Sequence, residues 1–471
     1  MRVTQVGIRP SEASTNAGRP VLTPELLAAT GARYSRNNDG LEAILSLIDP
    51  NNLEKSVDGI FKMIDYGHES IADMVPVAMF IDGISIWLAY HIWSISPTAS
   101  GQESSTRYIK LSDEGLLHPS LLGIPVQRHE EWNALMRSSF DAYQKELHLW
   151  ENILQTNPQM ANIPEAILED RSDRAQKQVA RMRRNFAFDR SRYFLPVAAA
   201  TNLMLLMSAR QWVYLCQNLF SHPLPEAQFL GEKILRELEL SAPRLVKHAE
   251  RKTSRTAGIL AELQHARVDA STIDRKYLEP GAIQHQHPEN ASFEVFKPAR
   301  DFPISVASDL AFHENRYSWV GENLRRVGVR FSWEAVALAE LRDLNRHRTG
   351  NKFSRLVPRG FYCAWEEIPT SDGKSREELL RLSDTGRHAS MQALSFLENG
   401  DHTYVYWSLL GTQYAFEHTT TADKFIYEAE LRTGVGAHFK YASHLRSMLD
   451  LWYRTFPETR GLVIEGSAEP E

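Results

Sequence analysis

The sequence predicts an α+β fold made of two diverged copies of one helix-rich domain, and three observations lead to this prediction. A chain of 471 residues is too long for a single hydrophobic core, so two domains are expected. Apolar residues recur at helical spacing over long segments, at 128–155, 171–194, 198–220 and 226–252. Short β-prone pieces precede two further helical patterns, with 75–80 before 81–95 and 326–331 before 332–347.

A proline-rich stretch separates the two expected copies. Residues 270–303 hold four prolines among polar residues, a composition typical of a linker. The sequence therefore predicts a first copy over 1–268, a linker over 269–303 and a second, degenerate copy over 304–471. Two helices are expected within 41–66, and the second copy should add helices near 374–398, 403–432 and 435–456.

Composition limits the class of partner and the cellular compartment. The formal net charge is −6 and no basic run is dense, which argues against nucleic acid as a main partner. Only Cys216 and Cys363 are present, so we expect no disulfide framework and a cytoplasmic protein. The N-terminus lacks a signal-peptide pattern, and Asp82 and His91 interrupt the apolar stretch 74–95. That stretch predicts a buried helix, with no role for a membrane.

A loop dense in hydroxyl groups, Ser100 to Tyr108, is the first candidate site. Arg107 offers a planar fork for phosphate, the serines donate to phosphate or base oxygens, and Glu103 can accept from a sugar hydroxyl. A phosphorylated nucleoside would suit this loop. Spacing alone, however, favours an ordinary surface turn.

Two further pieces carry basic side chains. Arg346-His347-Arg348 would suit a pyrophosphate or an anionic flavin, although on spacing alone a solvated helix end is the favoured account of three basic residues. Gly67-His68-Glu69-Ser70, with Ala32-Arg33-Tyr34-Ser35 upstream, places a histidine where it could stack on a flat ring or relay a proton. Such a histidine more often caps a helix or fills a gap.

Together these pieces resemble the flavin-dependent thymidylate synthase family. The family signature is Arg-His-Arg, two residues, Ser, one residue, Asn or Gln, two residues, Ser, one residue, Arg-Tyr. The first copy keeps the second part of this signature but has Ile95-Ser96-Pro97 in place of Arg-His-Arg; the kept residues are Ser100, Gln102, Ser105, Arg107 and Tyr108. The second copy keeps Arg346-His347-Arg348 and has lost the second part.

The later helix of each copy shows the same complementary loss. Where the family has Asn-Ala-Arg and a nucleotide-binding arginine nine residues on, the first copy has Ser208-Ala209-Arg210 and then Leu219. The second copy has Thr421-Ala422-Asp423 and keeps Arg432. Because family active sites resemble clefts shared between subunits of a homotetramer, the resemblance implies one site shared by both copies and a homodimer that mimics the tetramer.

The resemblance also implies a reaction, its cofactors and the roles of single residues. The reaction would be reductive methylation of dUMP to dTMP with FAD, NADPH and methylenetetrahydrofolate. Ser105, Arg348 and His68 would be catalytic. The nucleotide would be held by Glu103, Ser105, Arg107, Tyr108 and Arg432, and the cofactors by Ser35, His68, Ser70, Gln102, Arg210, Arg346, His347 and Arg348.

Other hypotheses stay open at this point. The lost family positions allow a relative that acts on another pyrimidine nucleotide or one-carbon donor, or a flavin- or nucleotide-binding paralogue without catalysis. His285-Gln286-His287 could chelate a metal, but it lacks a carboxylate at matching spacing, so no metal is predicted. Arg181-Met182-Arg183-Arg184 is expected to be a solvated helix face.

Overall fold

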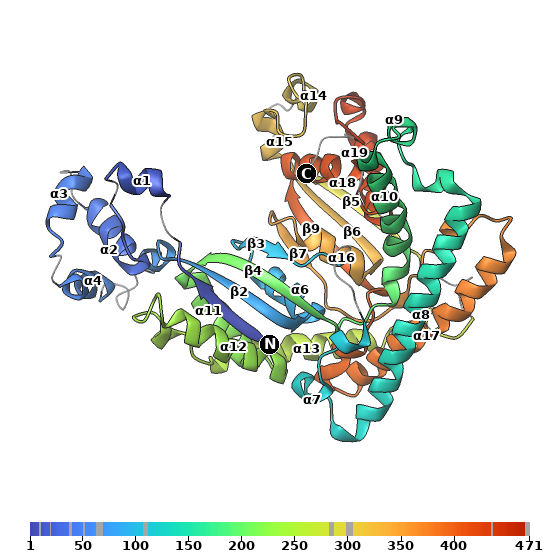
Figure 1. The fold of residues 1–471 in the computed structure, drawn as a ribbon, viewed down its shortest axis with the longest axis horizontal. Coiled ribbons are helices and arrows are strands. Elements are labelled where there is room, and N and C mark those ends of the chain that lie inside the picture. The colour runs from blue at the N-terminus through green and yellow to red at the C-terminus, as the bar shows by residue number, and fades with distance from the viewer. Residues whose placement is uncertain are drawn as a thin grey trace. The chain divides into compact units, whose positions relative to one another are not determined.

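The computed structural model describes residues 1–8, 11–18, 20–36, 40–49, 52–62, 69–106, 112–281, 287–297, 305–434 and 437–466. The chain forms two compact units. Unit 1 is Met1–Leu111, Gly115–Val126 and Ala198–Glu262, and unit 2 is Ser112–Glu114, Gln127–Val197 and Leu263–Glu471. Each unit contains one antiparallel sheet and many helices, so the predicted α+β class is confirmed (Figure 1).

Unit 1 is built on a four-stranded sheet with the order β1-β2-β4-β3. Its strands are β1 (Arg2–Val6), β2 (Pro76–Ser85), β3 (Ser100–Glu103) and β4 (Ala200–Ser208). Helices α11 (Ala209–Ser221) and α12 (Pro225–Leu238) pack against this sheet and bury its apolar side chains. The other helices of this part are α1 (Glu12–Asn16), α2 (Pro24–Tyr34), α3 (Gly40–Ser46), α4 (Leu53–Phe61), α5 (Ser70–Asp73), α6 (Ile86–Ile95) and α7 (Pro119–Leu122). Helix α13 (Thr253–Ala270) begins in unit 1 and ends in unit 2.

Unit 2 has a sheet of five strands, in which β5-β6-β9-β7 form the main path and β8 pairs with β9. The strands are β5 (Ala291–Phe296), β6 (Gly328–Ala337), β7 (Asn351–Phe353), β8 (Gly360–Phe361) and β9 (Thr412–Thr421). Helices α18 (Ala422–Thr433) and α19 (Phe439–Thr455) pack against the sheet. The remaining helices are α8 (His129–Thr156), α9 (Glu165–Glu169), α10 (Asp173–Ser191), α14 (Val306–Asp309), α15 (Glu322–Arg326), α16 (Leu338–Asn345) and α17 (Gly373–Glu398).

The two sheets share one register. Met79 in β2 faces Gln5 on one side and Leu205 on the other, and Phe331 in β6 faces Phe293 and His418 at the same places. The edge strands agree as well, since Ser100 faces Leu206 and Asn351 faces Thr419. Both central strands carry an irregularity near their ends, at Asp82/Ile84 and Trp333/Val336. Two sheets with the same order and register are what two diverged copies of one domain would give.

Two predicted helices begin later in the structure than in the sequence prediction. The patterns at 81–95 and 332–347 begin as strands, and the helices start at Ile86 and Leu338. In the first, Ser85 ends the strand and caps the helix, with its Oγ accepting from the Leu88 N–H over 2.9 Å. The buried Glu226 carboxylate in turn accepts from the Ser85 N–H and hydroxyl, which fixes the helix start.

Two segments predicted as helical contain a central strand. The pattern at 198–220 is β4 followed by α11, and the pattern at 403–432 is a 3-10 turn, β9 and α18. In β4 both faces carry apolar side chains, so the alternation that marks a strand is missing from its sequence. By contrast, the segments 128–155, 171–194 and 374–398 are helical as predicted, in α8, α10 and α17.

The two compact units differ from the predicted boundaries of 1–268, 269–303 and 304–471. Strand β5 lies inside the predicted linker and is part of the second sheet. Residues 127–197 belong to unit 2, because α8 and α10 pack together and α8 packs against α17. The Trp132 indole N–H, fully buried on α8, donates to the Tyr406 carbonyl over 2.9 Å and anchors this packing.

Candidate functional site

The predicted nucleotide loop begins as an edge strand of the first sheet. Gln102 is exposed, while Glu103 and Ser105 are half-buried where β3 ends. The backbone of this edge approaches β4 so closely that a Cβ on Gly101 would lie 1.9 Å from the Met204 carbonyl oxygen. Only glycine fits there. Arg107 and Tyr108 lie outside the described residues, so their predicted roles stay predictions.

Arg210 joins two helices of unit 1. It stands in the first turn of α11 and makes ion pairs of 2.8 Å with both Glu69 and Asp73, beside α5. These contacts raise its pKa, chiefly through the hydrogen bond to Asp73. Ser70, another predicted cofactor residue, is the first residue of α5 and is exposed. The structure therefore brings Arg210 and the segment of Ser70 together, whereas His68 lies outside the described residues.

A cavity of about 300 Å³ lies beside Arg210. Its lining includes Glu69, Tyr214, His248 and Lys252, none of which was predicted from the sequence. Arg255 lies 4.3 Å above the Tyr214 ring, so the aromatic face is backed by a cation.

Ser35, another predicted cofactor residue, follows the last residue of α2 and is exposed. Its hydroxyl donates to the Ala32 carbonyl over 3.0 Å.

The basic triplet of unit 2 divides into two exposed arginines and a buried histidine. Arg346 and Arg348 are exposed at the C-terminal end of α16, where the helix dipole favours positive charge. Arg346 lies 3.5 Å from Asp343 one turn earlier. His347 is buried between them. Burial lowers its pKa well below the usual value, and the nearby Arg432 and Lys352 charges lower it further.

Arg432 contacts His347 within unit 2. Its Nε–H donates to His347 Nε2 over 3.0 Å, and its guanidinium lies 5.7 Å from the centre of the Tyr441 ring. The Tyr441 hydroxyl donates to Glu428 over 2.9 Å. Burial raises the pKa of Glu428 to about 7. The structure thus brings the predicted residues His347 and Arg432 together in a partly buried polar cluster.

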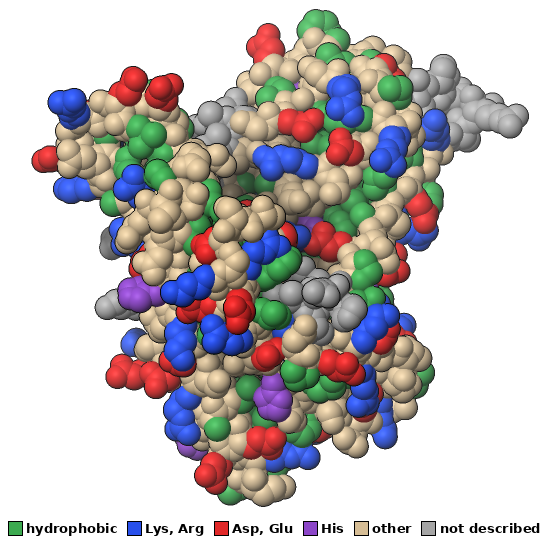
Figure 2. Space-filling model, turned by 90° about the vertical axis from the view of Figure 1, so that its right-hand side faces the viewer, with side chains coloured by type: hydrophobic (Ala, Val, Ile, Leu, Met, Phe, Trp, Pro, Cys, Tyr) green, Lys and Arg blue, Asp and Glu red, His purple; other side chains and the backbone are tan. Residues whose placement is uncertain are grey.

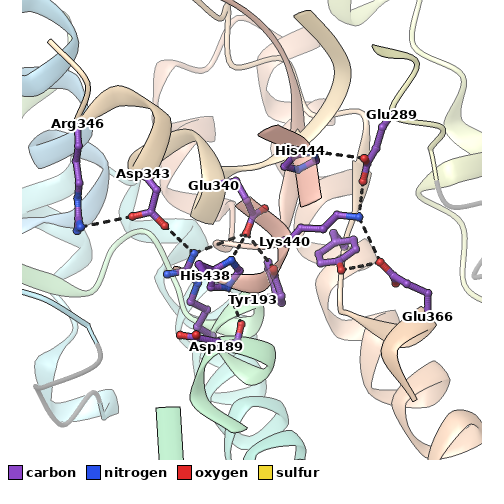
Figure 3. Close-up of polar contacts among 12 residues, drawn as sticks. Asp189, Tyr193, Glu289, Glu340, Asp343, Arg346, Glu366, His438, Lys440 and His444 are labelled. Carbon is purple, nitrogen blue, oxygen red and sulfur yellow. Dashed lines mark hydrogen bonds and ion pairs between the residues drawn. The ribbon is translucent and has the colours of Figure 1, made fainter. Parts of the chain in front are cut away.

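A second polar cluster of unit 2 was not predicted from the sequence (Figure 3). The Tyr193 hydroxyl donates to the fully buried Glu340 over 2.9 Å, and Arg192 bonds Asp343 over 3.1 Å. His438 Nε2 donates to the Asp189 carbonyl over 3.0 Å and points its Nδ1 toward Glu340 at 3.6 Å. Burial raises the pKa of Glu340 to about 8, against the effect of Arg192. For Asp343, burial is outweighed by Arg192 and Arg346, which hold its pKa far below the usual range.

A signal for this cluster was present in the sequence. Glu340 and Asp343 lie one helical turn apart in α16, among residues that are otherwise mostly apolar. Two acids on the buried side of a helix need cations or donors, because an unpaired buried carboxylate is costly. The partners, however, come from a segment almost 150 positions earlier, which spacing cannot reveal.

Lys440 and Glu289 belong to a group of ion pairs beside this cluster (Figure 3). The Lys440 ammonium lies 2.6 Å from Glu289 and 3.3 Å from Glu366, and His444 lies 3.3 Å from Glu289. Burial would raise the pKa of Glu289, but His444 and Lys440 lower it to about 2. These contacts tie β5 and its preceding turn to α19, so they stabilise the fold of unit 2.

One face of the molecule carries charges of both signs. Figure 2 shows acidic and basic side chains interspersed over one face, without a broad basic area. In the part of the chain that the structure describes, no group of three His, Cys, Asp or Glu side chains is placed to hold a metal ion. Of the helices described, none combines the length and apolar character needed to cross a bilayer.

The fold and these clusters define a helix-rich α+β protein in which a hydroxyl-bearing strand edge and an arginine-lined cavity belong to one sheet unit. Residues 21–244 match the family model described as thymidylate synthase complementing protein, so this segment belongs to that family. The predicted resemblance is thereby confirmed for the first copy. The second copy lies outside the matched residues.

Two known proteins match part of this chain. The UPF0159 protein Ta1429 of Thermoplasma acidophilum is 27% identical over 235 residues, which cover 46% of this chain and 47% of that protein. The chain thus matches about half the length of this curated relative. A solved structure of the UMP/dUMP methylase PolB from Streptomyces cacaoi, bound with 5-Br dUMP, is 16% identical, with a TM-score of 0.31. That match covers 52% of this chain and 93% of the other, a likeness too weak to bear on function.

Proposed function

We propose that this chain is an enzyme of the flavin-dependent thymidylate synthase type that methylates dUMP to dTMP. The observation that carries the proposal is the family match of residues 21–244, which includes the β3 edge and Arg210. Within it, Ser100, Gln102 and Ser105 keep the signature types in and just after an edge strand. NADPH and methylenetetrahydrofolate are the proposed co-substrates, and the proposed compartment is the cytoplasm.

The residues of unit 1 fit a flavin. Arg210 lines a cavity that also holds Lys252, and its two carboxylate partners fix its guanidinium beside the opening. An anionic pyrophosphate would find two cations there, while Tyr214 offers a ring face. When bound, FAD would supply the hydride-carrying ring. The chain's part is to hold and orient this ring, and in our proposal Ser35, Ser70 and Gln102 donate to it.

The nucleotide is proposed to lie at the β3 edge. Ser105 and Glu103 are half-buried there and would orient the base and the sugar, and Arg107 with Tyr108 would hold the phosphate. His68 would stack on the folate ring. No enzyme nucleophile is needed, because stabilising negative charge on the pyrimidine oxygen can activate the ring.

The second copy is proposed to supply Arg346, Arg348 and Arg432 to the same active site in the assembled protein. Arg346 and Arg348 are exposed, which supports a role in binding an anion. His347 would act by positioning Arg432 through their 3.0 Å contact, not by carrying a proton. A neutral imidazole with a strongly lowered pKa is unsuited to charge stabilisation at neutral pH.

A homodimer that mimics a tetramer is the proposed assembly. Pro196 and Leu409 stand equally far before α11 and α18, and they form a β-bridge with each other. Around this bridge, the Val197 N–H donates to the Ser408 carbonyl and the Leu410 N–H donates to the Leu195 carbonyl. Both residues belong to unit 2, so this pairing is a contact within one compact unit.

A second candidate is a flavin- or nucleotide-binding paralogue without catalysis. The observation that favours it is the engagement of His347 and Arg432 with each other, together with Leu219 at the first copy's nucleotide position. A relative acting on another pyrimidine nucleotide or another one-carbon donor is the remaining alternative within the family.

Absorbance and NADPH oxidation test the proposal. A yellow protein that oxidises NADPH only when dUMP is present supports the enzyme, and a colourless protein supports a binding paralogue without catalysis. Arg107→Ala and Arg348→Ala should each abolish dUMP-dependent oxidation. Arg381→Ala, at an exposed arginine of α17, is the matched control and should leave the rate unchanged. Normal turnover in either of the first two variants would contradict a site served by both copies.

A further inference from the structure

Unit 2 contains a cavity of about 380 Å³ on its own sheet. The cavity opens beside β6, β7 and β9, and the chain that follows β7 closes it. Its polar and aromatic lining includes Ser332, Phe353, Arg355, Arg359 and Glu417. The volume lies in the range of small-molecule sites, about 300 to 1,000 Å³.

Arg359 is the charged group that this cavity leaves unsatisfied. Its backbone N–H donates to the Gln413 carbonyl over 3.0 Å, which fixes the residue against β9. Its side-chain Nε–H is buried and meets no acceptor among the described residues. A buried donor without an acceptor is unfavourable, so a ligand oxygen that reaches this N–H would be favoured.

Arg355 and Phe353 form an adjoining surface for a flat ring. Phe353 is 56% exposed, and the Arg355 guanidinium lies 5.4 Å from the centre of its ring. Arg355 is held in place by an ion pair with Asp269. An exposed aromatic ring with an adjacent guanidinium is suited to stacking on a nucleobase.

The backbone between the two arginines is strained. Leu356 has a φ of 53°, a left-handed conformation that non-glycine residues rarely adopt. Such strain persists only where the surroundings impose it, often at ligand sites. Leu356, Arg355 and Arg359 all line the same cavity.

An acceptor completes the set. Glu417 lies opposite Phe353 in the pairing of β7 with β9 and is half-buried at the cavity. A carboxylate there can accept from hydroxyl or amine groups of a ligand. The cavity therefore combines a cation for an anionic group, a ring surface and an acceptor, which are the three features that a nucleotide needs.

We propose that this cavity is a second ligand site, specific for a nucleoside monophosphate. Its phosphate would bind Arg359, its base would stack on Phe353 and its sugar hydroxyls would donate to Glu417. The site differs from the proposed catalytic one, since Leu356 and Pro358 stand in the second copy where Ser105 and Arg107 stand in the first. It also lies beyond the residues matched by the family model.

Calorimetric titration of the full-length protein with dUMP, AMP and inorganic phosphate tests this site. Arg359→Ala should weaken nucleotide binding at one site about 10- to 100-fold, because a charge-assisted hydrogen bond is lost. The number of nucleotides bound per chain should fall by one. Glu417→Gln should weaken the binding of nucleotides without changing the binding of phosphate. Arg381→Ala should bind both as the wild type does.

Each outcome separates this proposal from the proposed function. If the enzyme activity is absent, nucleotide binding that depends on Arg359 still supports the second site. If dUMP-dependent NADPH oxidation is present but Arg359→Ala binds the same number of nucleotides with the same affinity, the second site is wrong. Phosphate that binds as tightly as AMP and dUMP would also overturn it, because neither Phe353 nor Glu417 would then contribute.

Discussion

The Nε–H of Arg432 donates to Nε2 of His347 over 3.0 Å, so this imidazole nitrogen is an acceptor and carries no proton. The contact explains why the Arg-His-Arg triplet does not act as three equal cations. Arg346 and Arg348 remain exposed, whereas His347 is a neutral, buried support for Arg432.

The buried neutral histidines make a contribution to stability that is lost on acidification. Burial lowers the pKa of His347 well below its usual value and that of His418 to about 3, with help from the Lys352 charge in both cases. Between pH 6.5 and 5 these two histidines bind protons in the unfolded chain but not in the folded chain, so their contribution to stability is lost as pH falls. The slope should approach about 1.4 kcal/mol per pH unit for each histidine. Thermal unfolding followed by circular dichroism checks it.

His418→Gln is the variant that assigns this effect. It should make the dependence on pH between 6.5 and 5 shallower, because one group that titrates only in the unfolded chain is gone. His148→Gln, at an exposed histidine on α8, should leave the slope as in the wild type. Identical slopes in all three proteins would show that His418 is not held neutral.

Glu340→Gln should stabilise the protein at alkaline pH. The pKa of Glu340 is raised to about 8 by burial, so the folded protein keeps this proton where the unfolded chain has lost it. The contribution of Glu340 to wild-type stability should therefore fall as pH rises from about 4.5 through 8. Glutamine stays neutral and can still accept from Tyr193. The melting temperature of the variant should exceed that of the wild type at pH 8.5 and match it at pH 5. The reverse order would mean that Glu340 is ionised and paired with Arg192.

Arg210→Ala should weaken flavin binding in unit 1. The change removes the cation beside the 300 Å³ cavity and leaves Glu69 and Asp73 without their partner. We expect an affinity about tenfold lower or more, measured by quenching of flavin fluorescence. Arg236→Ala, on α12 and outside the cavity lining, is the matched control. Equal affinity in both variants would remove Arg210 from the cofactor site.

Arg244→Ala should loosen the N-terminal helices. Arg244 bonds the buried Glu25 of α2 and lies 2.7 Å from Asp58 of α4, so one side chain holds both helices. Removing it leaves Glu25 buried without its cation, at a cost of about 3 kcal/mol. Hydrogen exchange should speed up over α2 and α4, while α8 and α17 stay protected. Unchanged exchange in α2 would show that packing alone holds this helix.

Much of the helical part of the fold could be predicted from periodicity. α8, α10 and α17 are long and amphipathic, so their apolar stripes are visible in the sequence. The strands β4 and β9 could not be separated from the helices that follow them. Each runs without a turn into α11 or α18, and in β4 apolar residues occupy both faces.

The candidate site was predictable only where short motifs carry it. Arg210 and His347 were found because family positions mark them, and the structure then supplied their partners Asp73 and Arg432. Lys252 at the first cavity and Arg359 at the second belong to no motif, and only the folded chain brings them to a cavity.

Methyl transfer to dUMP tests the central claim most directly. The purified protein is incubated with FAD, NADPH, dUMP and methylenetetrahydrofolate labelled in its one-carbon group, and the nucleotides are separated. The account predicts labelled dTMP that depends on both FAD and NADPH. A flavin-loaded protein that binds dUMP but forms no labelled dTMP would contradict it.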